Sequence, residues 1–276
     1  MTAPNGASLT LTSGQIDEIA AAHEQAKRTV TPIRRITLTH PGMTIDDAYA
    51  CQQRWVELQL VGGRTVAGHK IGLTSRAMQQ AVSIDEPDFG TLLDDMVVEP
   101  GSELHAASYL DPKLEVELAF VLERRLEGDA VTAADVLAAT DFVVPAAELI
   151  DARSYRVDPH DGVSRTVRDT IADNAANAGI VTGGGRVDAR SLDLRWVGAI
   201  VARNGVVEET GLAAGVLGDP VLGIVWLARR LARYGVALEP ALPILAGSFT
   251  RPVACRAGDE FELDFGPLGS LQLAFG

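Results

Sequence analysis

The segment Pro112–Leu122, PKLEVELAFVL, places two carboxylates inside one of the most apolar stretches of the chain. Side chains alternate along a β-strand, so Glu115 and Glu117 point to one face, followed there by Ala119 and Val121. The other face is apolar throughout. Such a pattern is typical of a strand in the interior of a sheet that is covered on both sides. The sequence therefore predicts that both glutamates lie away from bulk water.

Two carboxylates about 5 Å apart repel each other by roughly 3 kcal/mol at an effective dielectric constant of about 20. This repulsion must be offset by a shared proton, by a buried cationic side chain or by a divalent cation. Oxygen-only ligands would favour a hard ion such as Mg²⁺ or Mn²⁺. A strand at the rim of the protein, with both glutamates in water, fits the two-residue spacing equally well.

Two further residues interrupt apolar runs. Glu148 would be a third buried carboxylate, and three oxygen ligands leave coordination positions open for water and substrate, unless Glu148 pairs with Arg153 instead. Lys70 lies in the apolar, glycine-flanked segment 68–73. A lysine buried near a cation has a lowered pKa and can act as a neutral base, but Lys70 could equally neutralise the same carboxylates.

The composition bears on the class of protein. A chain of 276 residues with 47% hydrophobic and 22% charged residues is globular, which excludes general disorder. The formal net charge of −13 and the lack of a basic run argue against nucleic-acid binding. An anionic substrate would therefore need a metal ion or cationic side chains placed at its site.

The sequence also predicts a soluble, cytoplasmic protein. No apolar run reaches the length of about 18 residues that a membrane span needs. Residues Met1–Leu11 lack the basic start and apolar core of a signal peptide. Cys51 and Cys255 form no Cys-x-x-Cys pair, which indicates reduced, packed thiols.

Capping residues and hydrophobic periodicity outline the elements. Helices are predicted from Thr12 to about Lys27, from Thr44 to about Leu60, from Thr74 to Val82, over Thr132–Ala139 and over Val221–Tyr234. Strands are predicted over Arg64–Leu73, Leu92–Val98, Leu114–Leu122, Phe142–Ile150, Leu194–Ala202, Leu242–Thr250, Phe261–Phe265 and Ser270–Phe275. Asn204-Gly205 predicts a hairpin. We expect an α+β chain, with a helical cap over residues 1–63 and a strand-rich domain over residues 64–276.

Five blocks of the sequence resemble the hydratase/decarboxylase family of the fumarylacetoacetate hydrolase superfamily. The blocks are GHKIGLTS from Gly68, EPDFG from Glu86, LEVELAF from Leu114, ELIDAR from Glu148 and IADNAAN from Ile171. The likeness covers nearly the whole chain from about Gln15. It implies a small N-terminal cap, a catalytic domain built as a mixed β-roll, and assembly into a homo-oligomer, either a pentamer or a decamer.

The resemblance also implies a site. Glu115, Glu117 and Glu148 would hold Mg²⁺ or Mn²⁺, with Lys70 beside them. Asp88 matches an acidic position of the hydratases that is apolar in the decarboxylases of the family, which favours hydration over decarboxylation. Lys70 and Asp88 would act as the catalytic acid and base.

The implied substrate is a 2-oxo acid dianion from the breakdown of aromatic compounds: a 2-hydroxy-2,4-dienoate, or its 2-oxo-4-enoate tautomer, with a second carboxylate at the far end. Arg251 is a candidate for binding that distal carboxylate, because a guanidinium suits bidentate binding, although a surface arginine after a strand would look the same. Thr74 and His69 complete the expected substrate-binding set. His69 points to the opposite face of its strand from Lys70 and would support the site indirectly.

Three other functions fit the same residues. A decarboxylase would use the same metal chelate and release CO₂. A hydrolase of acylpyruvates would need a general base, often a histidine, and would release pyruvate. A non-enzymatic, metal-stabilised scaffold would leave dienol absorbance unchanged.

Overall fold

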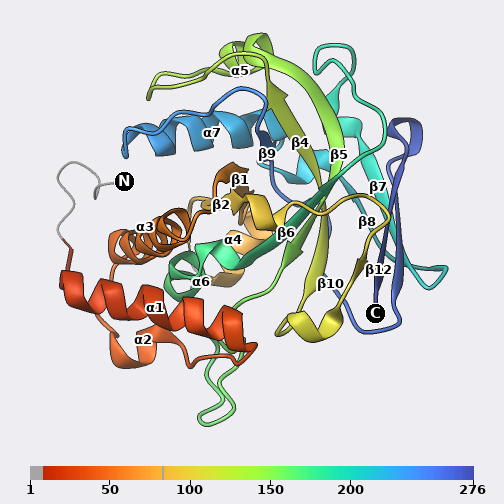
Figure 1. Cartoon of the computed structure of the whole chain (residues 1–276). Coiled ribbons are helices and arrows are strands. Elements are labelled where there is room, and N and C mark those ends of the chain that lie inside the picture. The colour runs from red at the N-terminus through yellow and green to blue at the C-terminus, as the bar shows by residue number, and fades with distance from the viewer. Residues whose placement is uncertain (1–8, 83) are drawn as a thin grey trace.

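The computed structural model describes residues 9–82 and 84–276 as two sheets with helices packed along one side, as Figure 1 shows. The segment Met1–Leu11, which is predicted not to be a signal peptide, lies mostly outside the described residues. The mixed helix-and-sheet architecture, with a helical region ahead of a curled sheet, confirms the α+β prediction.

The structure describes seven α-helices, of which five begin where capping residues predict them. The seven are α1 (Ser13–Thr29), α2 (Ile36–Thr39), α3 (Ile45–Val61), α4 (Arg76–Val82), α5 (Ala133–Ala139), α6 (Val167–Ala172) and α7 (Pro220–Ala232). At α1, α3 and α5 a threonine side chain accepts the N–H three residues on, and that residue's side chain bonds back to the threonine N–H. These reciprocal bonds satisfy backbone groups that a helix end leaves unpaired. The α2 and α6 helices were not predicted.

The first sheet has the strand order β2-β1-β9-β4-β5-β6, with β10 beside β4. Its strands are β1 (Val66–Gly72), β2 (Asp88–Leu93), β4 (Lys113–Leu122), β5 (Thr140–Ile150), β6 (Asn177–Thr182), β9 (Pro243–Leu245) and β10 (Val253–Ala254). Neighbouring strands are antiparallel except for β1 and β9. The long β4–β5 pair forms its centre, and most of β4 is buried.

The second sheet has the order β3-β12-β11-β7-β8 and lies to the right in Figure 1. Its strands are β3 (Glu103–Leu104), β7 (Gly198–Arg203), β8 (Val206–Leu212), β11 (Glu260–Asp264) and β12 (Ser270–Phe275). The predicted turn joins β7 to β8, because Asn204 and Gly205 both have positive φ, at 53° and 76°. Along β11, buried and exposed residues alternate, so only one face of this sheet enters the core.

Three predicted strands are misplaced. The strand predicted over Leu194–Ala202 begins only at Gly198, as β7, because a 3₁₀ turn occupies Leu194–Trp196. The strand predicted over Leu92–Val98 is wrong, because β2 ends at Leu93 and a 3₁₀ turn follows over Asp94–Met96. The strand predicted over Leu242–Thr250 ends at Leu245, because Gly247 has φ +118° and turns the chain out of the ladder. Polar residues or a glycine inside these segments determine where each strand ends. Hydrophobicity alone does not predict these ends.

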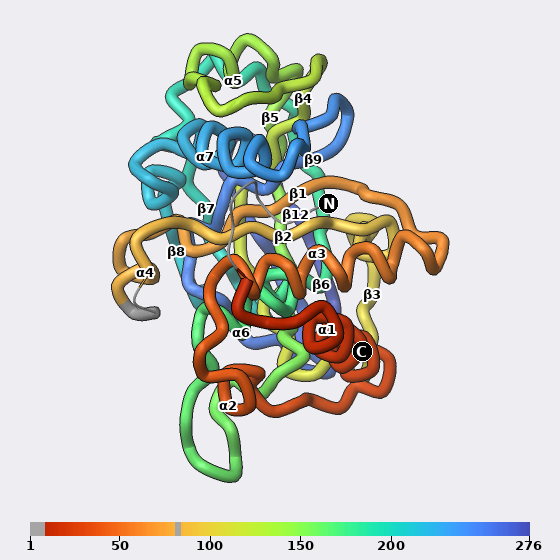
Figure 2. Tube along the Cα trace, turned by 90° about the vertical axis from the view of Figure 1, so that its left-hand side faces the viewer, coloured from red at the N-terminus to blue at the C-terminus, as the bar shows by residue number. Residues whose placement is uncertain are grey.

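The helical region and the first sheet share one hydrophobic core. Tyr49 on α3 stacks on Phe89 of β2 with ring centroids 4.6 Å apart. On the same helix Gln52 donates from Nε2 to the carbonyl oxygens of Phe89 and Ile171. Figure 2 shows α1 and α3 lying in front of the strands. The chain leaves α3 at Gly62, and we propose that the division between cap and sheet domain lies there, at residue 63.

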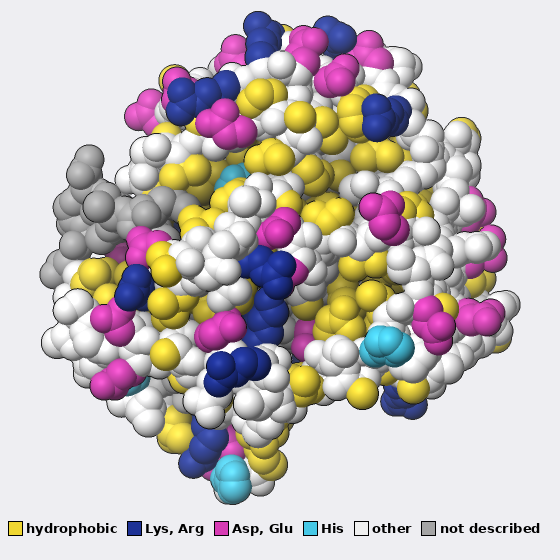
Figure 3. Space-filling model, viewed as in Figure 1, with side chains coloured by type: hydrophobic (Ala, Val, Ile, Leu, Met, Phe, Trp, Pro, Cys, Tyr) yellow, Lys and Arg dark blue, Asp and Glu magenta, His cyan; other side chains and the backbone are white. Residues whose placement is uncertain are grey.

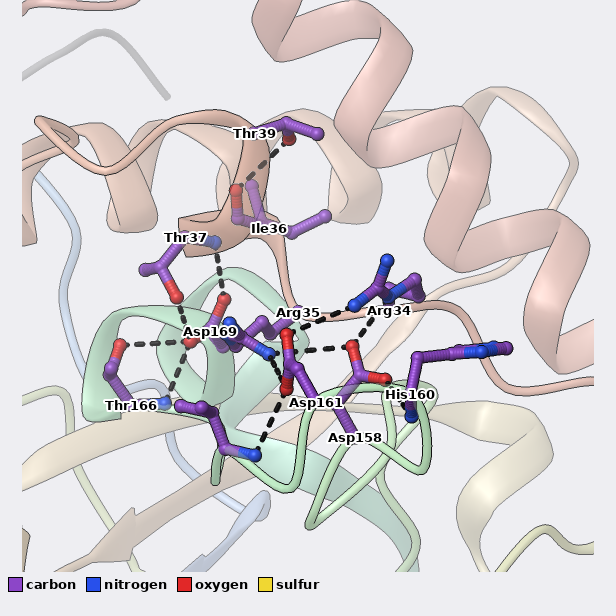
Figure 4. A network of polar contacts seen from close by, with 11 residues as sticks. Arg34, Arg35, Ile36, Thr37, Thr39, Asp158, His160, Asp161, Thr166 and Asp169 are labelled. Atoms are coloured by element: carbon purple, nitrogen blue, oxygen red, sulfur yellow. Dashed lines mark hydrogen bonds and ion pairs between the residues drawn. The ribbon is translucent and has the colours of Figure 1, made fainter.

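A network of ion pairs ties the loop after β5 to the segment before α2 (Figure 4). Arg35 pairs with Asp158 and Asp161 of that loop. Asp169, which is fully buried in α6, accepts the backbone N–H and the hydroxyl of Thr37, each at 2.8 Å. These contacts fix α6, and therefore the turn that follows it, against the N-terminal helices.

The molecular surface carries both signs of charge. On the face drawn in Figure 3, acidic and basic side chains are interspersed, and the face is hollowed near its middle. Within the described part of the chain, no helix combines the length and the apolar character needed to cross a membrane.

Candidate metal centre

The register of β4 against β5 brings three glutamates together. Glu115 lies directly opposite Glu148, and Glu117 lies on the same face opposite the small side chain of Ala146. One carboxylate oxygen from each glutamate lies within 4.8 Å of the others. The alternative of a rim strand with both glutamates in water is wrong, because Glu117 is fully buried, while Glu115 is half-buried.

These carboxylates are placed where negative charge is costly. The side chains of Glu117 and Glu148 are 0% and 1% exposed. Burial, with a further contribution from neighbouring carboxylates, raises the pKa of Glu115 to about 8 and that of Glu117 well above its usual range. Oε1 of Glu117 is buried and receives no hydrogen bond from the described residues. Such a cluster requires protons or a cation.

Gly247 orients Glu117. Its backbone N–H donates to Oε2 of Glu117 at 2.7 Å, whereas Oε1 has no hydrogen-bond donor among the described residues. A Cβ on Gly247 would lie 2.5 Å from the side chain of Thr74, and its φ of +118° also favours glycine. Gly247 was not among the predicted site residues, although a glycine just beyond a buried strand is a signal for such a close approach.

Lys70 is the cationic partner of the cluster. Its Nζ lies 3.2 Å from Oε1 of Glu148, and the two side chains are 4% and 1% exposed. Burial alone would lower the pKa of Lys70, but the surrounding carboxylates, Glu148 first and then Asp88, raise it above its ordinary value. Of the two predicted states, the structure shows the paired one. The suggested Glu148–Arg153 pair is wrong, because Arg153 pairs with Asp173 at 2.9 Å.

Asp88 and Lys70 share one face of the β1–β2 pair, and each lies opposite a glycine. Lys70 pairs with Gly90 and Asp88 with Gly72. A Cβ on Gly72 would lie 2.3 Å from Oδ1 of Asp88 and 3.3 Å from Nζ of Lys70. Burial raises the pKa of Asp88. Because Gly72 and Gly90 have no side chains, they leave the space in which the functional groups of Lys70 and Asp88 lie. Neither glycine was among the predicted site residues.

The remaining predicted residues lie in different places. Thr74 is buried against Gly247, next to the cluster. His69 is buried on the opposite face of β1, where burial lowers its pKa to about 4. Arg251 lies at the surface with its side chain 82% exposed and pairs with Glu209 at 2.6 Å. The structure thus brings together the three glutamates, Lys70 and Asp88, and leaves His69 and Arg251 outside this cluster.

The donor set fits a hard divalent cation. All three ligand groups are carboxylates, which suit Mg²⁺ or Mn²⁺ rather than a soft metal. Three protein ligands leave positions for a chelating substrate and for water. A lysine and a carboxylic acid beside such an ion are the groups needed to move protons on a bound keto acid.

Comparison with known proteins yields no match to a family model. The chain is 52% identical over 257 residues to 2-oxo-hept-4-ene-1,7-dioate hydratase of Escherichia coli, which covers 93% of this chain and 96% of that protein. It is 39% identical over 265 residues to 2-keto-4-pentenoate hydratase of Paraburkholderia xenovorans, covering 96% of each.

Among solved structures, 4-oxalocrotonate decarboxylase of Pseudomonas putida, complexed with magnesium and adipate, superposes with a TM-score of 0.92. The match covers 98% of this chain and 100% of that chain at 32% sequence identity. The curled sheet and the preceding helices are therefore shared along the full length of both proteins.

Proposed function

The chain belongs to the hydratase/decarboxylase family of the fumarylacetoacetate hydrolase superfamily, and on this premise we propose that it is a hydro-lyase acting on 2-oxo-hept-4-ene-1,7-dioate. The enzyme adds water to this acid, or to its 2-hydroxydienoate tautomer, and forms 4-hydroxy-2-oxoheptane-1,7-dioate. The observation that carries the proposal is the cluster of Glu115, Glu117 and Glu148, in which Nζ of Lys70 lies 3.2 Å from Oε1 of the buried Glu148. This reaction belongs to the breakdown of aromatic compounds.

We propose Mg²⁺, or Mn²⁺, as the cofactor held by these three glutamates. Oε1 of Glu117, which has no hydrogen-bond partner within the described part of the chain, and the raised pKa of all three carboxyl groups support it, since a bound cation would stabilise the ionised forms. The ion supplies Lewis-acid polarisation of the α-keto acid.

The protein residues move protons. An isolated C4–C5 double bond does not accept water, so the double bond must first shift into conjugation with the C2 ketone. This shift removes a proton from C3 and adds one at C5, and we assign these transfers to Lys70 and Asp88. Lys70 would be the base at C3 once a cation held by the glutamates had offset the carboxylate charge that keeps its ammonium protonated, and Asp88 would be the acid at C5. Water then adds at C4, and C3 regains a proton. Burial raises the pKa of Asp88, which supports its use as an acid near neutral pH and as the group that orients the water.

Substrate binding is assigned to Thr74 and Arg251, with His69 in support. The contact of Thr74 with Gly247 supports its position at the site, because Gly247 also holds Glu117. Arg251 follows in the same segment and would have to exchange its pairing with Glu209 for the distal substrate carboxylate. Its high exposure leaves the guanidinium free to make that exchange.

Decarboxylation of 4-oxalocrotonate is the second candidate. The similarity to a decarboxylase that binds magnesium and adipate supports it, because adipate is a diacid. Asp88 favours hydration, since its carboxyl group supplies a proton-transfer site that loss of CO₂ does not require. Hydration of 2-hydroxypenta-2,4-dienoate is a closer variant that lacks the distal carboxylate.

The test follows the ultraviolet absorbance of a series of 2-hydroxydienoates, with Mg²⁺ and with EDTA. We expect metal-dependent loss of dienol absorbance that is fastest with the seven-carbon diacid. Release of CO₂ from 2-oxohex-3-enedioate would support the decarboxylase instead. An unchanged absorbance with every dienol would overturn the hydratase proposal.

We further propose a homo-oligomer, either a pentamer or a decamer, in the cytoplasm. Large apolar side chains exposed around the β7–β8 hairpin support an assembled state; they are Trp196, Ile200, Val206, Val207 and Leu212. Both cysteines, Cys51 and Cys255, are free and buried, as suits a reducing compartment. Analytical ultracentrifugation would give the number of subunits.

A further inference from the structure

The free edge of β2 is closed by a side chain. In the first sheet β2 is the terminal strand, paired only on its β1 side along the described sheet path. On its other side the amide of Asn174 makes two hydrogen bonds to Thr91: Oδ1 accepts the backbone N–H and Nδ2 donates to the carbonyl, each at 2.9 Å. The amide thus replaces a neighbouring strand at one residue of β2.

Asn174 stands at the start of an unusual turn. Asn174, Ala175 and Ala176 have φ values of 50°, 52° and 58°, so three successive residues with side chains adopt the left-handed conformation. Glycine adopts this conformation freely and asparagine adopts it occasionally, but the two alanines are strained there, and such strain persists only where surrounding contacts enforce it. Non-glycine residues in this region cluster at functional sites.

The surrounding contacts are strong. Arg153 donates its backbone N–H to the Asp173 carboxylate at 2.6 Å and Nη1 to the same group at 2.9 Å. Its Nη2 donates to the carbonyl of Asn177 at 2.8 Å. One buried guanidinium therefore fixes both ends of the turn.

The turn contacts the strand residue that faces Lys70. Gly90 precedes Thr91 and is the direct partner of Lys70 across β1 and β2. A Cβ on Gly90 would lie 2.7 Å from the backbone oxygen of Asn174 and 3.3 Å from Cε of Lys70. The side chain of Lys70 therefore passes over Gly90 on its way to Glu148, and the Asn174 turn sets where Gly90 lies.

We propose that Asn174 is a positioning residue for Lys70: its amide and the strained turn hold Gly90 so that the ammonium group reaches Glu148 and the substrate. Asn174 itself does not touch the reacting atoms. The inference rests on the proposed hydratase function, in which Lys70 transfers a proton. It adds to the proposed site a positioning residue that lies far from Lys70 in the sequence.

The test compares Asn174→Gly with Ala175→Gly. The first change deletes the amide but suits the left-handed backbone, whereas the second suits the same backbone and keeps the amide. For Asn174→Gly we expect kcat to fall at least about tenfold, while KM and the Mg²⁺ dissociation constant stay within about twofold. For Ala175→Gly we expect all three constants to stay within about twofold of wild type.

Two further measurements test whether a fall in kcat comes from displacement of Lys70. A crystal structure of Asn174→Gly should show the distance from Lys70 Nζ to Glu148 Oε1 lengthened beyond 3.2 Å, whatever the activity of the protein. Gly90→Ala disturbs the same junction from β2 and should give the same loss of kcat with unchanged Mg²⁺ affinity. Because a Cβ on Gly90 would also lie 3.3 Å from Cε of Lys70, this variant tests the junction and not Asn174 alone. If Asn174→Gly does not fold, Asn174→Asp, which keeps the Oδ1 acceptor and loses the Nδ2 donor to Thr91, decides the question by the same expected fall in kcat.

The proposal is overturned if Asn174→Gly keeps its kcat, or if kcat, KM and Mg²⁺ affinity all worsen together in both variants, as general loosening of the fold would cause. A wild-type enzyme that hydrates no dienol would overturn the proposed function alone. The Lys70–Glu148 distance in the variant would still decide the positioning role.

Discussion

Lys70 on β1 and Glu148 on β5 form an ion pair of 3.2 Å inside the curled sheet, with both side chains almost completely buried. A single ammonium cannot balance the other carboxylates around it, and the pKa of Glu115 is raised to about 8 as a result of burial and of Glu148. Stability of the protein should therefore depend on both protons and metal.

For metal-free protein in EDTA, we expect the free energy of unfolding to fall as the pH rises from about 5 to 8. The folded carboxyl groups bind protons more tightly than the unfolded ones, so the folded state holds more protons in this window and loses stability as they leave, by at most about 1.4 kcal/mol per pH unit for each group. Urea unfolding at several pH values measures this. Saturating Mg²⁺ should reverse the trend, and a flat profile in EDTA would contradict the prediction.

Glu117→Gln should abolish metal-dependent activity, with a loss in kcat/KM of at least about 100-fold, because it removes a charged ligand. Isothermal titration should show weakened Mg²⁺ binding. The matched control is Glu262→Gln. Glu260 and Glu262 repeat the Glu-x-Glu spacing on β11, but both side chains are exposed. Loss of Mg²⁺ binding in that control would show that the cluster on β4 is not the metal site.

Gly72→Ala should separate proton transfer from metal binding. The new methyl group would lie 2.3 Å from Oδ1 of Asp88, so the carboxyl group must move. We expect kcat to fall at least about tenfold while Mg²⁺ affinity is kept. Gly14→Ala in α1 is the control for a glycine-to-alanine change that causes no clash, because a Cβ there meets nothing within 4 Å. Steady-state kinetics would refute the idea if both variants matched wild type.

Arg251→Ala tests recognition of the distal carboxylate. We expect KM for the seven-carbon diacid to rise about 10- to 100-fold, the range for a lost charge-assisted hydrogen bond, and KM for 2-hydroxypenta-2,4-dienoate to stay unchanged. Arg256→Ala, a nearby exposed arginine, is the control. Equal effects on both substrates would exclude the assignment.

Local signals in the sequence located most elements. The paired capping residues at Thr12, Thr44 and Thr132 gave correct helix starts, because such bonds form between residues close in the chain. The β2 strand was misplaced, since the buried Asp88 and the adjacent Gly90 do not look like strand residues without their partners on β1. Tertiary pairing overrides propensity there.

The site was predictable where its residues are chemically conspicuous. Acidic or basic side chains inside apolar runs drew attention to Glu115, Glu148 and Lys70, which the structure brings together. Gly247 and Asn174 escaped notice because they act through backbone geometry and contacts across long sequence separations. No pattern in a single sequence predicts that the side-chain amide of Asn174 will hydrogen-bond to the free edge of β2.

The alignment of Glu115 with Glu148 has a consequence for how this chain tolerates change in evolution. Inserting or deleting one residue within β4 or β5 would turn the downstream side chains to the opposite face and scatter the three carboxylates. Within the β4–β5 unit, insertions and deletions should accordingly occur only in the connecting segment 123–139. A change of length there leaves the pairing of the two strands intact.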